Sequence, residues 1–220
     1  MTVTADSFTL NSIGTFVALG GTFSAHKRYD ATQRWPFLWT VPDPSIVPDG
    51  DPIRIPADVE QVAPGPELCA VIAEPLWQAE PAEATDAIAG FTISNDVKSY
   101  GEFPAYPYEG VDERVGRGYH IFPTFTPTLG SATSLSMETA MDLRMETYID
   151  GEQSVDTSTA EMGWTVAEMV AHVSRIIPLD PNDVVSLGDP THPDTFLDDA
   201  DLVTCRIEAI GELTNSIIAE

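Results

Sequence analysis

Two stretches, Glu67–Ala73 (ELCAVIA) and Phe91–Val97 (FTISNDV), decide the fold class of this chain. Prolines stand close to both ends of the first stretch, and its short apolar run predicts a largely buried strand. The second stretch is also predicted to be a strand. Between them, Pro81–Ala89 begins with proline at the first helical position and precedes Gly90, which predicts a short helix. This half of the chain is therefore expected to be built on sheet.

The second half adds two alternating stretches and one long helix. Met141–Ile149 alternates apolar and polar residues, and the Asp150-Gly151 pair that follows is typical of a hairpin turn. Leu202–Ile210 alternates in the same way. Trp164–Ile177 instead repeats its apolar residues at three- and four-residue spacing, which predicts an amphipathic helix.

The ends of this long helix carry their own signals. Thr165 and Glu168 have the spacing of a capping box, and Pro178 follows the last residue of the pattern. Several strands around one long and one short helix, without a regular βαβ rhythm, predict an α+β fold built mainly on sheet. No repeat or low-complexity linker divides the chain, so we expect one domain over residues 1–220.

The charge of the chain is strongly negative and limits its partners. Ten basic residues stand against 35 acidic ones among 220, a formal net charge of −25, which repels nucleic acid and anionic membranes. The acidic residues are spread through a chain that is 43% hydrophobic, so they do not form a disordered tail. Only Lys27 and Lys98 are lysines, and dense carboxylate with little lysine suits a salt-rich cytoplasm. We hypothesise a halophilic protein; the alternative is a merely acidic protein from a mesophile.

The hydropathy of the chain and the positions of its cysteines indicate the cellular compartment. No apolar run approaches the roughly 20 residues that a membrane helix needs, and the first ten residues do not resemble a secretory signal. Cys69 and Cys205 lie in apolar, strand-like stretches without metal-type spacing, so we expect two buried thiols. These features favour a cytoplasmic location.

Seven short motifs follow one another along the chain. They are Gly-x-x-Phe-x-x-His at Gly20–His26, Glu-Leu-x-x-Val-Ile at Glu67–Ile72, Gly-Phe-Thr-x-x-Asn-Asp-Val at Gly90–Val97, Arg-Gly-Tyr-x-x-Phe at Arg117–Phe122, Asp-Gly-Glu…Thr-x-x-Met at Asp150–Met162, Asn-Asp-Val-Val-x-x-Gly-x-Pro at Asn182–Pro190 and Ile-Gly-x-Leu-x-Asn at Ile210–Asn215. In this order and spacing, the chain resembles the C-terminal catalytic domain of the fumarylacetoacetate hydrolase family over nearly its whole length. The resemblance implies a mixed β-sandwich roll that assembles as a homodimer or a dimer of dimers.

The resemblance also implies a chemistry. Members of this family hold Mg²⁺ or Mn²⁺ with three carboxylates and act on 2-oxo or 1,3-dioxo acids by C–C hydrolysis, decarboxylation, hydration or isomerisation. A divalent cation that chelates adjacent carbonyl and carboxylate oxygens stabilises an enolate as a bond to carbon breaks. We therefore expect a metal-assisted hydrolase or lyase. The alternative is a relative whose site has decayed and which acts as a dimeric binding or accessory protein.

Two of the three metal carboxylates implied by the resemblance are present. Glu67 matches the second glutamate of the family's Glu-x-Glu motif, and Asp96 matches the aspartate of the next strand. The first glutamate falls on Gly65, so one ligand is missing, and Gly65→Glu is expected to strengthen ion binding if position 65 faces the ion. The other interpretation of Glu67 and Asp96 is that they are capping or surface carboxylates.

The resemblance assigns further roles to residues near the two ends of the predicted site. His26 matches a histidine that activates water from a segment closing over the site, so the N-terminal segment, 1–45, is expected to carry a lid over the core, 46–220. The glutamate that partners this histidine in the family is Tyr29 here, and Asp30 is the substitute we expect to orient His26. Arg117 stands where the family has a lysine, and it would stabilise developing negative charge or clamp a carboxylate. A solvated histidine and a structural ion pair of Arg117 are the alternatives.

The largest departure from the family pattern is Asp189. It replaces the second threonine of a Thr-Gly-Thr-Pro signature that holds the substrate's carboxylate end, and its charge would repel an anionic substrate. Alternatively, Asp189 supplies the missing metal charge from the other side of the pocket. With Asp189, the resemblance places Thr159 and Tyr119 among the substrate-binding residues.

Overall fold

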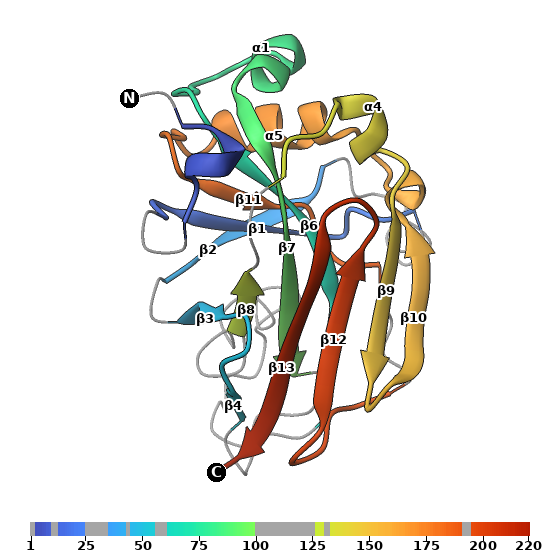
Figure 1. The fold of residues 1–220 in the computed structure, drawn as a ribbon. Coiled ribbons are helices and arrows are strands. Elements are labelled where there is room, and N and C mark those ends of the chain that lie inside the picture. The colour runs from blue at the N-terminus through green and yellow to red at the C-terminus, as the bar shows by residue number, and fades with distance from the viewer. Residues whose placement is uncertain are drawn as a thin grey trace, which may run out of the picture.

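The architecture is a curled pair of mixed sheets with few helices, as Figure 1 shows. The computed structural model describes residues 3–9, 13–24, 35–42, 45–55, 61–99, 126–129, 133–190 and 195–220. The predicted α+β class, built mainly on sheet, is confirmed. None of the helices in these described ranges is long and apolar enough to cross a membrane.

The larger sheet contains both of the stretches that decide the fold class. Within the described residues it has eight strands in the order β2-β1-β11-β6-β7-β8-β3, and β5 pairs with β7 off this path. The pairs β1–β11 and β3–β8 are parallel and the others are antiparallel, which makes the sheet mixed. The strand bounds are β1 Phe16–Gly20, β2 Phe37–Val41, β3 Val47–Pro48, β5 Val62–Ala63, β6 Pro66–Ile72, β7 Ile88–Ser99, β8 Thr126–Leu129 and β11 Val184–Ser186.

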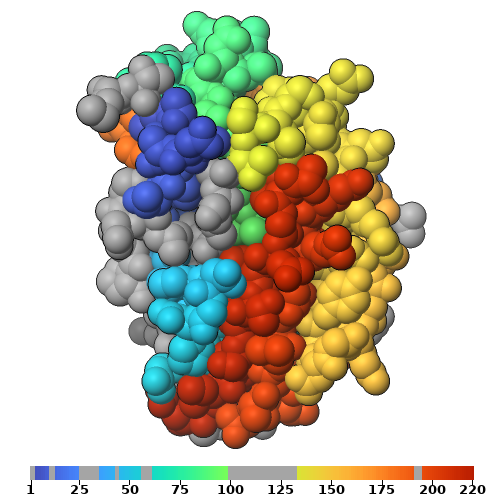
Figure 2. Space-filling view, viewed as in Figure 1, coloured from blue at the N-terminus to red at the C-terminus, as the bar shows by residue number. Residues whose placement is uncertain are grey.

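The smaller sheet comes mostly from the C-terminal half. Its five strands in the described ranges run β10-β9-β12-β13-β4, and only the pairing of β13 with β4 is parallel. The strand bounds are β4 Ile53–Ile55, β9 Arg144–Ile149, β10 Glu152–Ser158, β12 Leu202–Ile207 and β13 Gly211–Ala219. Asp150 and Gly151 both have positive φ, so the predicted hairpin turn between β9 and β10 is confirmed. Figure 2 shows the segment around β4, in cyan, lying along the C-terminal strands, in red.

The helices gather at one end of the molecule, and the C-terminus lies at the other (Figure 1). Those among the described residues are the 3-10 turns Ala5–Ser7 (η1) and Thr159–Glu161 (η5) and the α-helices Pro81–Asp86 (α1), Met137–Ala140 (α4) and Val166–Ser174 (α5). The predicted capping box at Thr165 and Glu168 is confirmed. The predicted pair of one long and one short helix needs correction, because α4 is a further short helix.

Two predicted helix ends are wrong, each for a physical reason. The short helix ends at Asp86, not at Ala89, because Ala87 O accepts a hydrogen bond from Ala73 N–H (2.7 Å) and the chain then joins β6 as β7. The long helix ends at Ser174, not at Ile177. Ile177 precedes a proline, which disfavours the α conformation there.

The core lies between the two sheets and beneath the helices. Buried side chains from β6 and β7, such as Leu68 and Ile93, share one apolar cluster with Met145, Cys205 and Leu213 of the smaller sheet. Both cysteines are free and buried, as predicted. β1 and β2, which come from the N-terminal segment, belong to the same sheet as β6. The sheet therefore fixes β6, β7 and β11, which carry most of the site.

Candidate metal centre

Two neighbouring strands place the predicted carboxylates on one face. Glu67 of β6 lies opposite Ser94 of β7, and Asp96 is two residues further along β7. Because side chains alternate along a strand, Ser94 and Asp96 point to the same side as Glu67. Glu67 and Asp96 are each only 2% exposed. The interpretation of these two residues as surface carboxylates is therefore wrong.

Hydrogen bonds hold the start of β6 against β7. Asp96 N–H donates to Gly65 O (2.7 Å), and Gly65 N–H donates to Asn95 Oδ1 (3.0 Å). On the other side of β6, Ser186 of β11 donates its hydroxyl proton to Glu67 Oε2 and accepts a hydrogen bond from Cys69 Sγ (3.1 Å). The backbone around Gly65 and the Glu67 side chain are thus held in place from both neighbouring strands.

A third carboxylate arrives from the turn that follows β11. Gly188 has a φ of +88°, and a Cβ there would collide with Thr22 Oγ1, so this turn requires glycine. The turn brings Asp189 to Glu67 and Asp96, and one oxygen from each of the three lies within 4.8 Å of the others. In the described part of the chain, no other group of three histidine, cysteine or acidic side chains could hold a metal ion.

Lys98 is the site residue that sequence reasoning missed. Its Nζ donates to Asp96 Oδ2 and to Asp189 Oδ2, each at 2.7 Å, and the lysine side chain is 23% exposed. A signal was present, because Lys98 follows Asp96 by two residues on a strand and must share its face. The scarcity of lysine in this acidic chain also marked the residue.

Position 65 faces the site, but Asp189 fills the space beside it. A Cβ built on Gly65 would lie 2.7 Å from Asp189 Oδ2, 3.0 Å from Asp189 Cβ and 3.0 Å from Lys98 Nζ. A glutamate at position 65 would therefore meet the Asp189 carboxylate before it reached an ion. The expectation that Gly65→Glu alone strengthens ion binding needs correction on this ground.

Burial governs the electrostatics of the site. Burial raises the pKa of Glu67 well above its usual range, and the nearby Asp96 charge adds to the rise, while Lys98 and Ser186 oppose it. Burial also raises the pKa of Asp96 to about 6, against the lowering effect of Lys98. A cation among these carboxylates would reverse such shifts, because it stabilises the ionised form of each group.

The donor set fits a hard divalent cation. Carboxylate oxygens are the ligands that Mg²⁺ and Mn²⁺ prefer. Asp96 Oδ1 is buried and lacks a hydrogen-bond partner among the described residues, and such an orphan oxygen is costly unless a ligand satisfies it. Glu67, Asp96 and Asp189 are the residues that would hold the ion, and Lys98 is the group already in contact with two of them.

The remaining predicted site residues separate into two groups. The proposed base His26, its partner Asp30, and Arg117 and Tyr119 lie outside the described residues. Thr159 is fully buried, and its Oγ1 accepts a hydrogen bond from Leu143 N–H (2.9 Å). That contact is structural, and a role for Thr159 in substrate binding stays a prediction.

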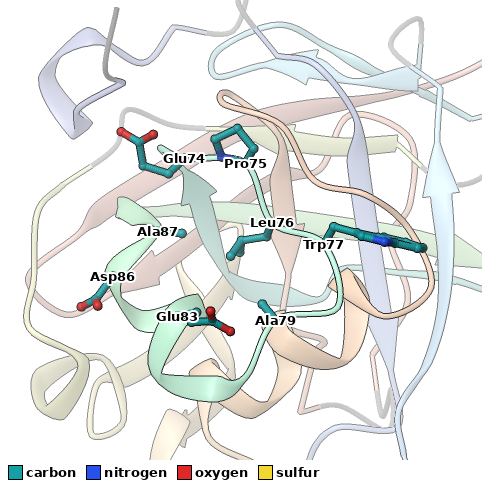
Figure 3. Close-up of a pocket in the computed structure, with 8 residues that line it drawn as sticks. All are labelled: Glu74, Pro75, Leu76, Trp77, Ala79, Glu83, Asp86 and Ala87. Atoms are coloured by element: carbon teal, nitrogen blue, oxygen red, sulfur yellow. The ribbon is translucent and has the colours of Figure 1, made fainter.

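A separate surface cavity of about 310 Å³ lies beyond the other end of β6. It is formed by the segment 74–79 and α1, and Figure 3 shows the Trp77 ring directed away from Leu76 and Ala79. The carboxylates of Glu74 and Asp86 stand apart from each other in this view. The cavity therefore lacks the convergence of charged groups that the Glu67 site has.

Comparison with known proteins identifies the family. The family model described as "Fumarylacetoacetate (FAA) hydrolase C-terminal" matches residues 15–218, so the chain belongs to this family. Protein Rv2993c from Mycobacterium tuberculosis is 30% identical over 183 residues, which cover 83% of this chain and 66% of that protein. The Escherichia coli homoprotocatechuate catabolism bifunctional isomerase/decarboxylase is 26% identical over 215 residues, covering 94% of this chain and 47% of that protein. The chain thus spans about half to two thirds of the length of these curated relatives.

A solved structure agrees with the fold. The crystal structure of fumarylpyruvate hydrolase from Pseudomonas aeruginosa, in complex with Mn²⁺ and pyruvate, superposes with a TM-score of 0.78. The match covers 94% of this chain and 91% of that chain at 19% sequence identity, and this likeness shows the fold alone. The expected sheet architecture of the family's C-terminal domain is therefore confirmed.

Proposed function

We propose that this chain is a divalent-cation-dependent enzyme that acts on a small 2-oxo or 1,3-dioxo acid. The reaction is C–C hydrolysis, decarboxylation, or hydration or isomerisation, and the cation is Mg²⁺ or Mn²⁺. The observation that carries the proposal is the convergence of Glu67, Asp96 and Asp189 within 4.8 Å, with Asp96 Oδ1 buried and unsatisfied in the described structure. The names of relatives, which include an isomerase/decarboxylase and a hydrolase bound to Mn²⁺ and pyruvate, support the same class of chemistry.

The chain's own residues would divide the work as follows. Glu67, Asp96 and Asp189 hold the cation, which when bound supplies Lewis-acid stabilisation of an enolate oxygen. Ser186 donates a hydrogen bond to Glu67 and so fixes the direction of that carboxylate. His26, oriented by Asp30, takes or gives the proton, and Arg117 neutralises the substrate's carboxylate; Thr159 and Tyr119 complete the predicted substrate contacts.

The dimeric binding or accessory protein is the second candidate, and one observation favours it. Lys98 already forms ion pairs with two of the three carboxylates, at 2.7 Å to each. A chain whose ammonium had permanently replaced the cation would keep the fold and lose the metal chemistry. The two candidates therefore differ in whether the purified protein binds a divalent cation.

The test begins with metal binding. Protein stripped with a chelator is titrated with Mn²⁺ by calorimetry and then assayed, with and without Mn²⁺, on oxaloacetate, acylpyruvates and 2-hydroxydienoates. We expect binding of one ion per chain and metal-dependent turnover of at least one oxo acid. Absence of Mn²⁺ binding would favour the binding or accessory protein, and Mn²⁺ binding without turnover of any of these acids would reject the proposed enzyme on these substrates.

Matched variants locate the activity. Glu67→Gln keeps the shape of the side chain but removes a charged ligand, and we expect it to abolish Mn²⁺-dependent turnover. Glu152→Gln makes the same chemical change at an exposed residue of β10 and is expected to leave turnover unchanged. Equal activity of the two variants would exclude Glu67 from the centre.

The proposal also covers the assembly, the location and the salt dependence of the protein. We propose a homodimer or a dimer of dimers, a cytoplasmic location and a halophilic character, the last because 35 acidic residues stand against ten basic ones. Sedimentation in dilute and molar KCl measures the assembly. Unfolding in the same two solutions tests halophily, which predicts higher stability in molar KCl.

A further inference from the structure

We infer that Lys98 is a tethered counter-cation that competes with the divalent ion for Asp96 and Asp189. The inference rests on the proposed function, because it concerns the same cation site. It adds a residue of this chain that sets how tightly the site binds its ion.

The contacts of Lys98 place its charge within the ligand set. Its Nζ is 2.7 Å from one oxygen of Asp96 and 2.7 Å from one oxygen of Asp189. Mg²⁺ typically binds its ligand oxygens at about 2.1 Å. An ion bound to either of these oxygens would therefore lie within about 5 Å of the ammonium, and two positive charges at that distance repel each other strongly.

The burial of the site makes this repulsion effective. Asp96 is 2% exposed, and the side chain of Asp189 is 12% exposed, so solvent screens the charges only weakly. Lys98 itself is 23% exposed on a flexible stem, which lets its ammonium move away when an ion arrives. The lysine ammonium can therefore move, whereas Asp96 is held on β7 and Asp189 on the turn that Gly188 forms after β11.

The carboxylate of Asp189 gives a reason for a counter-cation at this site. Asp189 occupies the space beside Gly65, 2.7 Å from where a Cβ would lie, and it brings a third carboxylate close to two buried ones. Without an ion, such a cluster is destabilised by like-charge repulsion and desolvation. Lys98 neutralises part of that charge in the metal-free protein, at the expense of affinity for the ion.

The experiment compares Mn²⁺ affinity and metal-free stability. Lys98→Met keeps an unbranched side chain of nearly the same length without its charge, and Arg54→Met removes one positive charge from an exposed ion pair with Glu220. We expect Lys98→Met to lower the Kd for Mn²⁺ at least tenfold, which is about 1.4 kcal/mol, and to lower the Tm of the chelator-treated protein. Arg54→Met should leave both values unchanged. An unchanged or higher Kd in Lys98→Met overturns the inference, as does the absence of Mn²⁺ binding in both wild type and variant.

A second measurement follows the wild-type protein and needs a variant only to assign one signal. With only two lysines in the chain, ¹³C-lysine labelling gives two side-chain Cε signals, and the one that Lys98→Gln removes belongs to Lys98. Displacement predicts that Mg²⁺ shifts this signal, and a Lys98 signal that is unmoved at saturating Mg²⁺ overturns the inference. If Lys98→Met binds Mn²⁺ more tightly but no oxo acid is turned over, the inference holds and the proposed enzyme is rejected. If an oxo acid is turned over but the Kd of Lys98→Met is unchanged, the enzyme holds and the inference is rejected.

Discussion

Gly65 and Asp189 should be energetically coupled, and the coupling can be calculated from their contacts. In Gly65→Ala, the new Cβ would lie 2.7 Å from Asp189 Oδ2 and 3.0 Å from Asp189 Cβ. The backbone cannot withdraw, because Gly65 N–H and O are both bonded to β7. Such overpacking costs about 1–3 kcal/mol, and the stiffer unfolded chain returns about 0.4–1 kcal/mol, so we expect a net loss of about 1–2 kcal/mol in the free energy of unfolding.

The same substitution should cost less than about 0.5 kcal/mol in an Asp189→Ala background. The closest contact is then gone, and Lys98 Nζ, at 3.0 Å, is the mobile end of a flexible side chain. Urea unfolding of the four proteins in chelator, followed by tryptophan fluorescence, should give a coupling energy of more than about 0.5 kcal/mol. The control is a second cycle that combines Gly65→Ala with Asp156→Ala, a change at an exposed aspartate paired with Arg144. The effects of these two substitutions should be additive. Additivity within about 0.5 kcal/mol in the Asp189 cycle as well would refute the packing described for position 65.

Three other predictions follow from the site and the fold. Gly65→Glu combined with Asp189→Ala should bind Mn²⁺ more tightly than Gly65→Glu alone, as measured by calorimetry, because the double variant gives the new glutamate the space of Asp189. Burial raises the pKa of Asp96 from 3.8 to about 6, so the native state holds this proton more firmly than the unfolded chain does. The free energy of unfolding of the metal-free protein should therefore fall as pH rises between about 4 and 6, as measured by urea unfolding, and Asp96→Asn should reduce that fall. Asp156→Asn is the control, at an exposed carboxyl whose pKa Arg144 lowers, and it should not reduce the fall. Thr165→Ala should destabilise the protein by about 1 kcal/mol in urea unfolding, because it removes the capping box of α5, whereas Thr204→Ala leaves that box intact and should not affect α5.

Local patterns predicted the strands and the helix start well because their causes are local. The apolar run around Leu68 and the alternation along β9 record which side chains face a core, and the Thr165–Glu168 pair records a contact within one turn. The helix ends were predicted less well. α1 ends where Ala87 O accepts a bond from Ala73, a contact between segments that no single-turn pattern encodes.

In the candidate site, too, the residues with local sequence signals could be predicted and those placed by contacts between distant segments could not. Glu67 and Asp96 could be predicted from the motifs, and Lys98 could have been found from its two-residue spacing to Asp96 on β7. The contact of Asp189 with them could not be read from spacing alone. It depends on β11 pairing with β6, where Ser186 lies opposite Cys69, and on the left-handed turn at Gly188 that follows.

The number of carboxylates at the centre bears on whether this site has decayed or has been rebuilt. The resemblance to the family implies a glutamate where this chain has Gly65 and a threonine where it has Asp189. If the two positions had drifted independently, the lost glutamate would have left a hollow at position 65 and a two-carboxylate site. Instead, Asp189 occupies the space beside Gly65, and three carboxylates still converge within 4.8 Å. The carboxylate gained at position 189 restores the number of acidic groups that the resemblance implies, which supports the proposed cation site over a decayed one.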